Sequence, residues 1–286
     1  MKPFHTLLPL GIFVSACLLG SGTSCSSHSH GSSDSTQTSS SLELALDSVV
    51  VRDTLYDQQA TRSGSTVAVD LVFRYPSGDS TLVPLFTRAF FGDEFQSTSP
   101  RETMTRFVEK IREEYLFGAL EGEEGFSKEE LTFMQSTFAM ENKVSYTDSL
   151  VVSIEKIESN YSHGAAHGIE GISYHNIDRR RHSLISEGDL FIEGYTLPLS
   201  KILQRCILRD YKAKTIEDLF NETSIDASEM PPNNNFAITR DGLIYYFNPY
   251  EIAPYVAGII QVRIPYEELR PILRPGSLLY AYLPAN

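Results

Sequence analysis

Two stretches with the alternation of β-strands flank a short loop of glycine, alanine and histidine, and this arrangement constrains the fold most. The loop, residues 161–168, reads Tyr-Ser-His-Gly-Ala-Ala-His-Gly. Residues 150–159 before it and 168–177 after it carry the apolar spacing of half-buried strands. Because glycine and alanine let the chain turn tightly, we predict a β-hairpin with two imidazoles at its tip.

Strand and helix patterns are mixed along the rest of the chain. Further strands are expected at residues 42–53, 67–75, 236–239, 243–247 and 259–264, and residues 81–86 are expected to pair with 67–75 as a hairpin. Helices are expected from Ser99 to Leu116, from Ser127 to about Met140, at 197–212 and after Pro265, with a short turn-helix segment at 185–191. Asp241-Gly242 between two apolar runs is a strong hairpin signal. This order predicts an α+β fold: an antiparallel sheet with helices packed on one face, in two closely associated lobes.

The first 25 residues have the pattern of a bacterial export signal. Lys2 precedes an apolar run, and small residues lead to Cys25, as in a lipobox whose cysteine is diacylated after cleavage. Cys17 is the alternative lipidation site, and ordinary cleavage without a lipid is the alternative process. Residues 26–41 are a Ser-rich stretch that cannot bury a core, so we expect a flexible tether. We therefore expect a lipoprotein of the cell envelope, anchored to a bacterial membrane and facing the periplasm or the exterior.

Composition restricts the partners. The formal net charge of -13 argues against nucleic acid, because phosphate binding needs a basic surface. The basic cluster Arg179-Arg180-Arg181 follows a predicted strand and is expected in a solvated turn. An acidic surface suits a basic protein partner, although it equally serves solubility. After the leader the chain has one cysteine, Cys206, which we expect to be buried in a helix rather than bridged.

The spacing of the histidines suggests a metal site as an alternative. His163 and His167 are four residues apart and His175 follows eight residues later, so a zinc-assisted hydrolase or deacetylase acting on envelope glycan is the alternative function. The glycines indicate a turn, and no acidic general base accompanies the pair. We expect His167 to fix the hairpin by a hydrogen bond to a strand carbonyl, and we expect no metal, cofactor or catalytic residue. The second candidate, residues 248–251 (Asn-Pro-Tyr-Glu), is expected to be a structural corner that packs Tyr250 and Tyr255 on the core.

From Tyr161 onward the chain resembles the extracytoplasmic C-terminal domain of RsiV-type anti-sigma factors, which also occurs in bacterial lipoproteins and beside a peptidoglycan deacetylase domain. The resemblance rests on residues 164–167 (Gly-Ala-Ala-His), 176–178 (Asn-Ile-Asp), 185–191 and 236–269. It implies a family domain at 161–286, preceded by a small α/β lobe at 42–160. The best understood member of the family is a membrane receptor that binds lysozyme and controls a sigma factor. Direct anti-sigma activity is not implied here, because the sequence shows no sigma-binding segment with a transmembrane helix.

We therefore expect a lipid-anchored, extracytoplasmic binding or sensor-type protein. The resemblance and the charge point to a lysozyme-like protein or a cell-wall glycan as its ligand. The expected recognition edge consists of two loops, and its candidate residues are Ser162, His163, His167, Asn248, Tyr250 and Tyr255.

Overall fold

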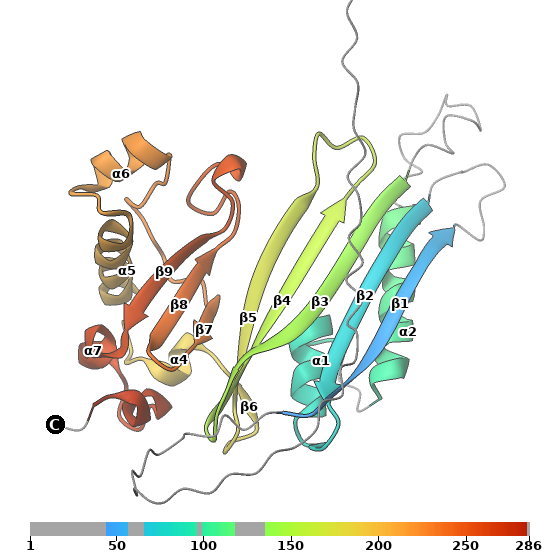
Figure 1. Ribbon diagram of the computed structural model, residues 1–286, viewed down its shortest axis with the longest axis horizontal. Helices are drawn as coiled ribbons and strands as arrows, with labels where there is room; N and C mark the ends of the chain where they lie inside the picture. The colour runs from blue at the N-terminus through green and yellow to red at the C-terminus, as the bar shows by residue number, and fades with distance from the viewer. Residues whose placement is uncertain (1–43, 57–65, 96–98, 118–134, 285–286) are drawn as a thin grey trace, which may run out of the picture. The chain divides into compact units, whose positions relative to one another are not determined.

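Two β-sheets organise the molecule, and the larger one is built from six strands in chain order (Figure 1). The computed structural model describes residues 44–56, 66–95, 99–117 and 135–284. The strands of the large sheet are β1 (Leu46–Tyr56), β2 (Thr66–Pro76), β3 (Gln135–Thr147), β4 (Val151–Tyr161), β5 (Ile169–Asp178) and β6 (Ser183–Ile185). Neighbouring strands are antiparallel except β2 and β3, which are parallel. The expected α+β fold is confirmed, with one parallel pair that the expectation lacked.

The parallel pair needs a crossover connection, and the helices α1 (Val83–Phe91) and α2 (Pro100–Arg112) belong to it. A single π turn, η1 (Glu113–Phe117), extends α2. Both helices pack on one face of the large sheet (Figure 1), in a core rich in phenylalanine. As expected, α2 begins at Ser99, whose side chain accepts a hydrogen bond from the backbone N–H of Glu102.

Two secondary-structure expectations in this half are wrong. Residues 81–86 do not form a strand: Leu82, Leu85, Phe86, Ala89 and Phe90 have the 3–4 spacing of a helix face, and all five are buried in α1 and its N-cap. The helix expected from Ser127 to Met140 also fails where the structure describes it, because residues 135–140 lie in β3. There every second side chain is buried, which is the period of a strand: Phe138, Met140 and Asn142.

The smaller sheet is antiparallel and consists of β7 (Phe236–Ile238), β8 (Gly242–Phe247) and β9 (Ile260–Pro265). Asp241-Gly242 forms the expected turn between β7 and β8. The helical segments around it are α4 (Glu187–Leu190), α5 (Thr196–Tyr211), α6 (Ile216–Thr223), α7 (Tyr266–Leu269) and the 3-10 turns η3 (Tyr255–Ala257), η4 (Arg270–Ile272) and η5 (Leu278–Tyr282). Of these, α6, η3 and η5 were not expected, although Thr215 and Asp218 form the capping box that begins α6.

The β4–β5 hairpin belongs to both halves of the fold. Val152 and Ile154 of β4 lie in the core with α1 and α2, whereas Val151 lies in the core formed by α5 and the small sheet. The domain boundary expected between residues 160 and 161 therefore falls at the end of a strand that pairs along its length with β5. Residues 179–181 form the expected turn between β5 and β6, and Cys206 is buried in α5, as expected.

Asparagine side chains, rather than a backbone ladder, connect β5 to the small sheet. Asn176 of β5 accepts a hydrogen bond from Ile238 N (3.0 Å) and donates to Phe236 O (2.7 Å). Asn235 accepts from Tyr174 N (2.9 Å) and donates to Ile172 O (2.9 Å). Each amide presents one acceptor and one donor, as a peptide unit does: Asn176 satisfies backbone groups of β7, and Asn235 satisfies backbone groups at the free edge of β5.

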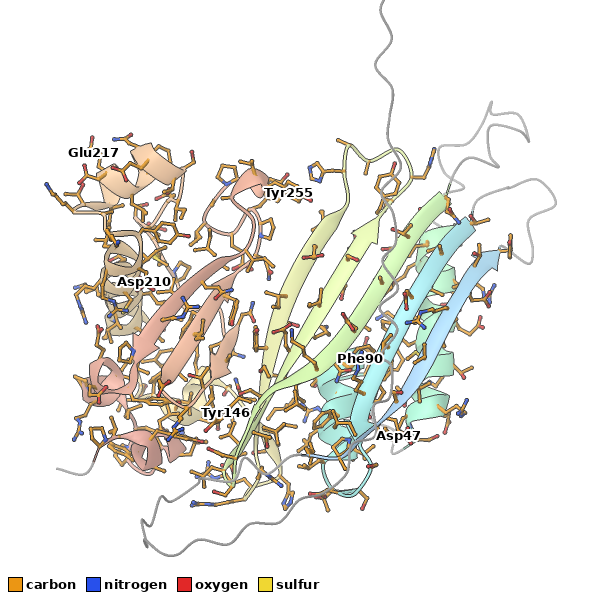
Figure 2. All side chains as sticks on the ribbon, viewed as in Figure 1. Asp47, Phe90, Tyr146, Asp210, Glu217 and Tyr255 are labelled. Carbon is orange, nitrogen blue, oxygen red and sulfur yellow. The ribbon has the colours of Figure 1, made fainter. Side chains whose placement is uncertain are left out.

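A half-buried carboxylate fixes the opposite end of the hairpin. Asp148, in the β3–β4 turn, accepts hydrogen bonds from the hydroxyls of Tyr146 (2.8 Å) and Tyr282 (2.7 Å) and from the backbone N–H groups of Leu150 and Val151. Tyr282 lies in η5, so this carboxylate attaches the C-terminal segment to the large sheet. Tyr146 marks the place at the lower end of the sheet in Figure 2.

Several expectations lie outside the described residues: the export signal at 1–25, lipidation at Cys25 or Cys17, the tether at 26–41, and the beginning of the helix at Ser127. In the part of the chain that the structure describes, no helix is long and apolar enough to cross a membrane.

Candidate functional site

The two loops predicted to form a recognition edge lie at the same end of the molecule. One joins β4 to β5 and the other joins β8 to β9 (Figure 1). Tyr255, labelled in Figure 2, lies on the second loop beside the tip of the β4–β5 hairpin.

The β4–β5 loop owes its shape to its glycines. Ala165 N donates to Ser162 O (3.0 Å), and Gly164 within this turn has φ +83°, a conformation that side chains disfavour. At Gly168 a Cβ atom would lie 3.0 Å from the carbonyl oxygen of Asn160, so the two strands approach closely where β5 begins. The small residues of this loop therefore serve the turn, and His167 within it is exposed.

Asn248 anchors the β8–β9 loop. Its side-chain oxygen accepts from Ile172 N (2.8 Å), and its amide nitrogen donates to Ile172 O (3.1 Å), so it too pairs with the free edge of β5. Tyr250, two residues after Asn248, has φ +72°. This backbone conformation costs a non-glycine residue about 1 kcal/mol. Its backbone is held there by the hydrogen bond from Tyr250 N to Ala253 O (3.0 Å).

Three rings from the two loops form a stack. The imidazole of His167 lies on the ring of Tyr255, with centroids 4.1 Å apart and 28° between the planes. Tyr250 and Tyr255 have centroids 5.9 Å apart, and the Tyr250 hydroxyl is 3.3 Å from His167 Nε2. The strained backbone at Tyr250 thus directs its ring toward the hairpin.

The contacts of His167 indicate which ring nitrogen carries the proton when the imidazole is neutral. Nδ1 lies 2.8 Å from the carbonyl oxygen of Gly168. A carbonyl oxygen only accepts, so Nδ1 carries the proton, and Nε2 is then the acceptor for the Tyr250 hydroxyl. The expected hydrogen bond to a strand carbonyl is therefore replaced by one to the adjacent residue, and the ring does not face the interior.

Exposed apolar side chains surround the stack. Val256 is 91% exposed, Tyr250 61%, Ile169 48% and Tyr255 37%. We call His167, Ile169, Tyr250, Tyr255 and Val256 the exposed edge. The expectation that Tyr250 and Tyr255 pack on the core is wrong, because both rings lie at the surface against His167. Apolar side chains gathered in this way are typical of interaction sites.

Of the six predicted site residues, the structure brings His167, Tyr250 and Tyr255 into contact. Asn248 holds a loop in place rather than facing outward. Ser162 and His163 are exposed on the hairpin loop, where His163 N donates to Ser136 Oγ (3.1 Å). Ile169 and Val256 were not among the predicted residues, since isolated aliphatic residues carry no sequence signal for a surface site.

The three histidines of the metal hypothesis do not form a site. His175 lies on β5, six strand residues beyond Ile169, which places it about 20 Å along the strand. Among the described residues, no three His, Cys, Asp or Glu side chains are grouped so that they could hold a metal ion. The ligand set His163, His167 and His175 is therefore not supported by the geometry.

Comparisons with known proteins agree with this fold. Residues 188–267 match the family described as "Protein of unknown function (DUF3298)". This match falls inside the region 161–286 on which the predicted resemblance rests. No curated protein matches the chain.

Two solved structures share the architecture. A member of the DUF3298 family from Bacteroides fragilis NCTC 9343 is similar with a TM-score of 0.67 and 22% identity, over 84% of this chain and 97% of its own. A DUF3298 family protein from Pseudomonas aeruginosa PAO1 has a TM-score of 0.58 and 19% identity, over 85% and 98% of the two chains. Residues 188–267 of this chain thus carry a DUF3298 match, and the described chain has the α+β fold of solved DUF3298 proteins.

Proposed function

We propose that this protein is a lipid-anchored binding protein of the cell envelope, and that its exposed edge binds another protein. The observation that carries the proposal is the ring stack of His167, Tyr250 and Tyr255, which a strained backbone holds at the surface beside Val256. Tyrosine is enriched among the residues that dominate protein interfaces, because a rigid ring buries a large area at low entropic cost.

The charge around the exposed edge favours a basic partner. Residues 157–178 and 241–262, which include both loops and the whole of β5 and β8, contain no lysine or arginine, and the cations on the two remaining strands are Lys156 in β4 and Arg263 in β9. Glu170 and Glu251 directly follow Ile169 and Tyr250 and are exposed. Together with the net charge of -13, this distribution attracts a cationic protein at low ionic strength. A lysozyme-like protein is the first partner to test, in agreement with the RsiV-type resemblance.

The strand directions support presentation away from an N-terminal anchor. β1 and β4 run the same way, because β1–β2 and β3–β4 are antiparallel and β2–β3 is parallel. The chain therefore enters the large sheet at the end opposite to the exposed edge. The 11 residues of β4 separate the two ends by about 35 Å. Such an anchor is the proposed lipid on Cys25, with Cys17 as the alternative.

Binding of the purified full-length chain to lysozymes tests the proposal. At low salt we expect association that weakens as salt rises. It should fall about tenfold or more in Val256→Asp and in Tyr255→Ala, because both remove apolar contact area. Leu197→Asp is the matched control: it places the same carboxylate on an exposed aliphatic position of α5 and should leave binding unchanged.

Other outcomes are informative. Equal binding by Val256→Asp and the unchanged chain would exclude the exposed edge as the interface. Binding of cell-wall glycan fragments but not of lysozymes would exclude a protein partner in favour of a glycan. The anchor is tested separately: membrane association should be lost in Cys25→Ser and retained in Cys17→Ser, and the reverse would identify Cys17.

A further inference from the structure

A pocket lies on the face of the β4–β5 hairpin that carries Lys156 and Ser173, at the edge of β5. It has a volume of about 280 Å³, and its polar lining comes from Lys156, Glu158 and Asn160 of β4, from Ser173 of β5 and from Asn248 of the β8–β9 loop. Lys156 pairs with Ser173, Glu158 with Gly171, and Asn160 with Ile169. Since Ile154 on the same face lies in the core with α1 and α2, the pocket continues that face beyond the helices.

Gly171 leaves the floor of this pocket open. A Cβ atom there would meet only the Asn248 side chain, at 3.7 Å, which is an ordinary contact. The backbone is not in a conformation that requires glycine, because Gly171 is absent from the positions with positive φ. The absence of a side chain therefore creates space rather than relieving strain. Ile169 supplies an apolar wall on one side.

Lys156 is a poorly compensated cation in this pocket. Its side chain is 20% exposed, and its ion-pair partner among the described residues is Glu158, with 3.9 Å between Nζ and the carboxylate oxygen. Burial lowers the pKa of Lys156, and the Glu158 charge opposes this shift. A half-buried ammonium whose carboxylate partner is 3.9 Å away is incompletely compensated, so it favours an anion that reaches it.

The neighbouring histidine adds no positive charge. His175 lies on the same face of β5 as Ser173, and the two side chains approach to 3.4 Å between Oγ and Nε2. Burial, reinforced by the charge of Lys156 and opposed by Asp93, lowers the pKa of His175 to about 4. At neutral pH the imidazole is therefore uncharged. Lys156 supplies the only positive charge among the residues that line the pocket.

We propose that this pocket binds the carboxylate of a small aliphatic acid or of a peptide C-terminus, between Lys156 Nζ and the hydroxyl of Ser173. The ammonium and the hydroxyl supply donors for the two carboxylate oxygens, and the Asn160 amide supplies another. Ile169 contacts the aliphatic part of the ligand. A dianion such as phosphate is disfavoured by the Glu158 carboxylate beside the site. This pocket shares Ile169 with the exposed edge, but its charged and polar lining is separate from the ring stack of His167, Tyr250 and Tyr255.

Titration of the ¹⁵N-labelled full-length chain with acetate, N-acetylalanine and inorganic phosphate tests it. We expect N-acetylalanine, with dissociation constants on the order of millimolar, to shift the backbone amides of residues 156–160 and 169–173. Acetate should bind more weakly because it lacks the apolar contact, and phosphate more weakly still. A longer probe, N-acetylalanylalanine, distinguishes the two sources: tighter binding indicates a peptide C-terminus, and equal binding a free acid.

Two variants locate the site. Lys156→Met keeps the length of the side chain without its charge and should weaken N-acetylalanine binding about tenfold or more. Gly171→Val fills the pocket while keeping Lys156 and should have a similar effect, with thermal unfolding to verify that each variant is folded. Lys201→Met on the exposed surface of α5 removes the same charge elsewhere and should bind normally. Unchanged binding in both pocket variants, equal binding of phosphate, or no shift with any probe would overturn the proposal.

Discussion

The imidazole of His167 stacks on the ring of Tyr255, with centroids 4.1 Å apart, and so joins loops that belong to different sheets. His167 follows β4 of the large sheet, whereas Tyr255 follows β8 of the small one. A contact of this kind makes the exposed edge depend on how the two sheets are joined.

The backbone of Tyr250 should store measurable strain. Tyr250→Gly and Tyr250→Ala remove the same ring, but glycine accepts φ +72° at little cost. We therefore expect the glycine variant to have the larger free energy of unfolding, by about 1 kcal/mol. Urea denaturation followed by circular dichroism measures the difference, and an alanine variant of equal or greater stability would contradict it.

Removing the side-chain amide of Asn176 should lower the free energy of unfolding. Asn176→Ala leaves the buried Ile238 N–H and Phe236 carbonyl without their side-chain partner. Unpaired buried backbone groups of this kind lower the free energy of unfolding by about 2–4 kcal/mol. Asn221→Ala on the exposed face of α6 is the control and should change stability by no more than about 0.5 kcal/mol. A loss at Asn176 as small as that of the control would refute the role of the amide.

Protonation of Asp148 should lower the free energy of unfolding at acid pH. Burial alone raises the pKa of this carboxyl, but hydrogen bonds from Leu150 N, the Tyr282 hydroxyl, Val151 N and the Tyr146 hydroxyl outweigh burial and hold the pKa below its ordinary value. A carboxyl with a lowered folded-state pKa stabilises the fold above its unfolded pKa of about 4, and this contribution is lost as the pH falls through the folded-state pKa.

Denaturation of the unchanged chain and of Asp148→Asn between pH 6 and pH 3 measures this contribution. The variant should be less stable at pH 6 by about 2 kcal/mol. Its stability should also depend less steeply on pH below pH 4. If the free energies of unfolding of the unchanged chain and of Asp148→Asn fell equally with pH, another group would cause the acid sensitivity.

Cys206 should be inert in the folded protein. Burial raises the pKa of its thiol to about 12, and the nearby Glu268 charge acts in the same direction. In a chain in which Cys17 and Cys25 are replaced by serine, Cys206 is the only thiol. Labelling by a thiol reagent at pH 8 should therefore be slow and should accelerate with denaturant as the protein unfolds. Rapid labelling without denaturant would show that α5 opens locally.

Local signals in the sequence predicted most of the C-terminal half of the fold. The glycine loop predicted the β4–β5 hairpin, and Asp241-Gly242 predicted β7–β8, because turn geometry depends on the residues within the turn. The apolar run at residues 81–86 was ambiguous between strand and helix, and its continuation through Phe90 settles it as α1. Around β3, Ser127 and Glu130 have the spacing of a capping box, which favours a helix, whereas the alternation of Phe138 and Met140 farther along indicates the strand that forms.

The candidate site was predicted only in part, for a physical reason. Both loops were identified because histidine, proline and tyrosine are conspicuous in a short segment. The contact of His167 with Tyr255 depends on the packing of one sheet against the other, which no local pattern encodes. The surroundings of Lys156 were missed for the same reason, since a lysine in an alternating strand normally indicates the solvated face.

The amides of Asn176, Asn235 and Asn248 have a consequence for how the exposed edge is positioned. A backbone ladder between β5 and the small sheet would change register in steps of one residue and would invert which side chains face inward. Side chains that imitate a peptide unit impose no such step, because each amide pairs with backbone groups of one or two residues only. The position of the exposed edge relative to β5 is therefore fixed by single side chains rather than by strand register.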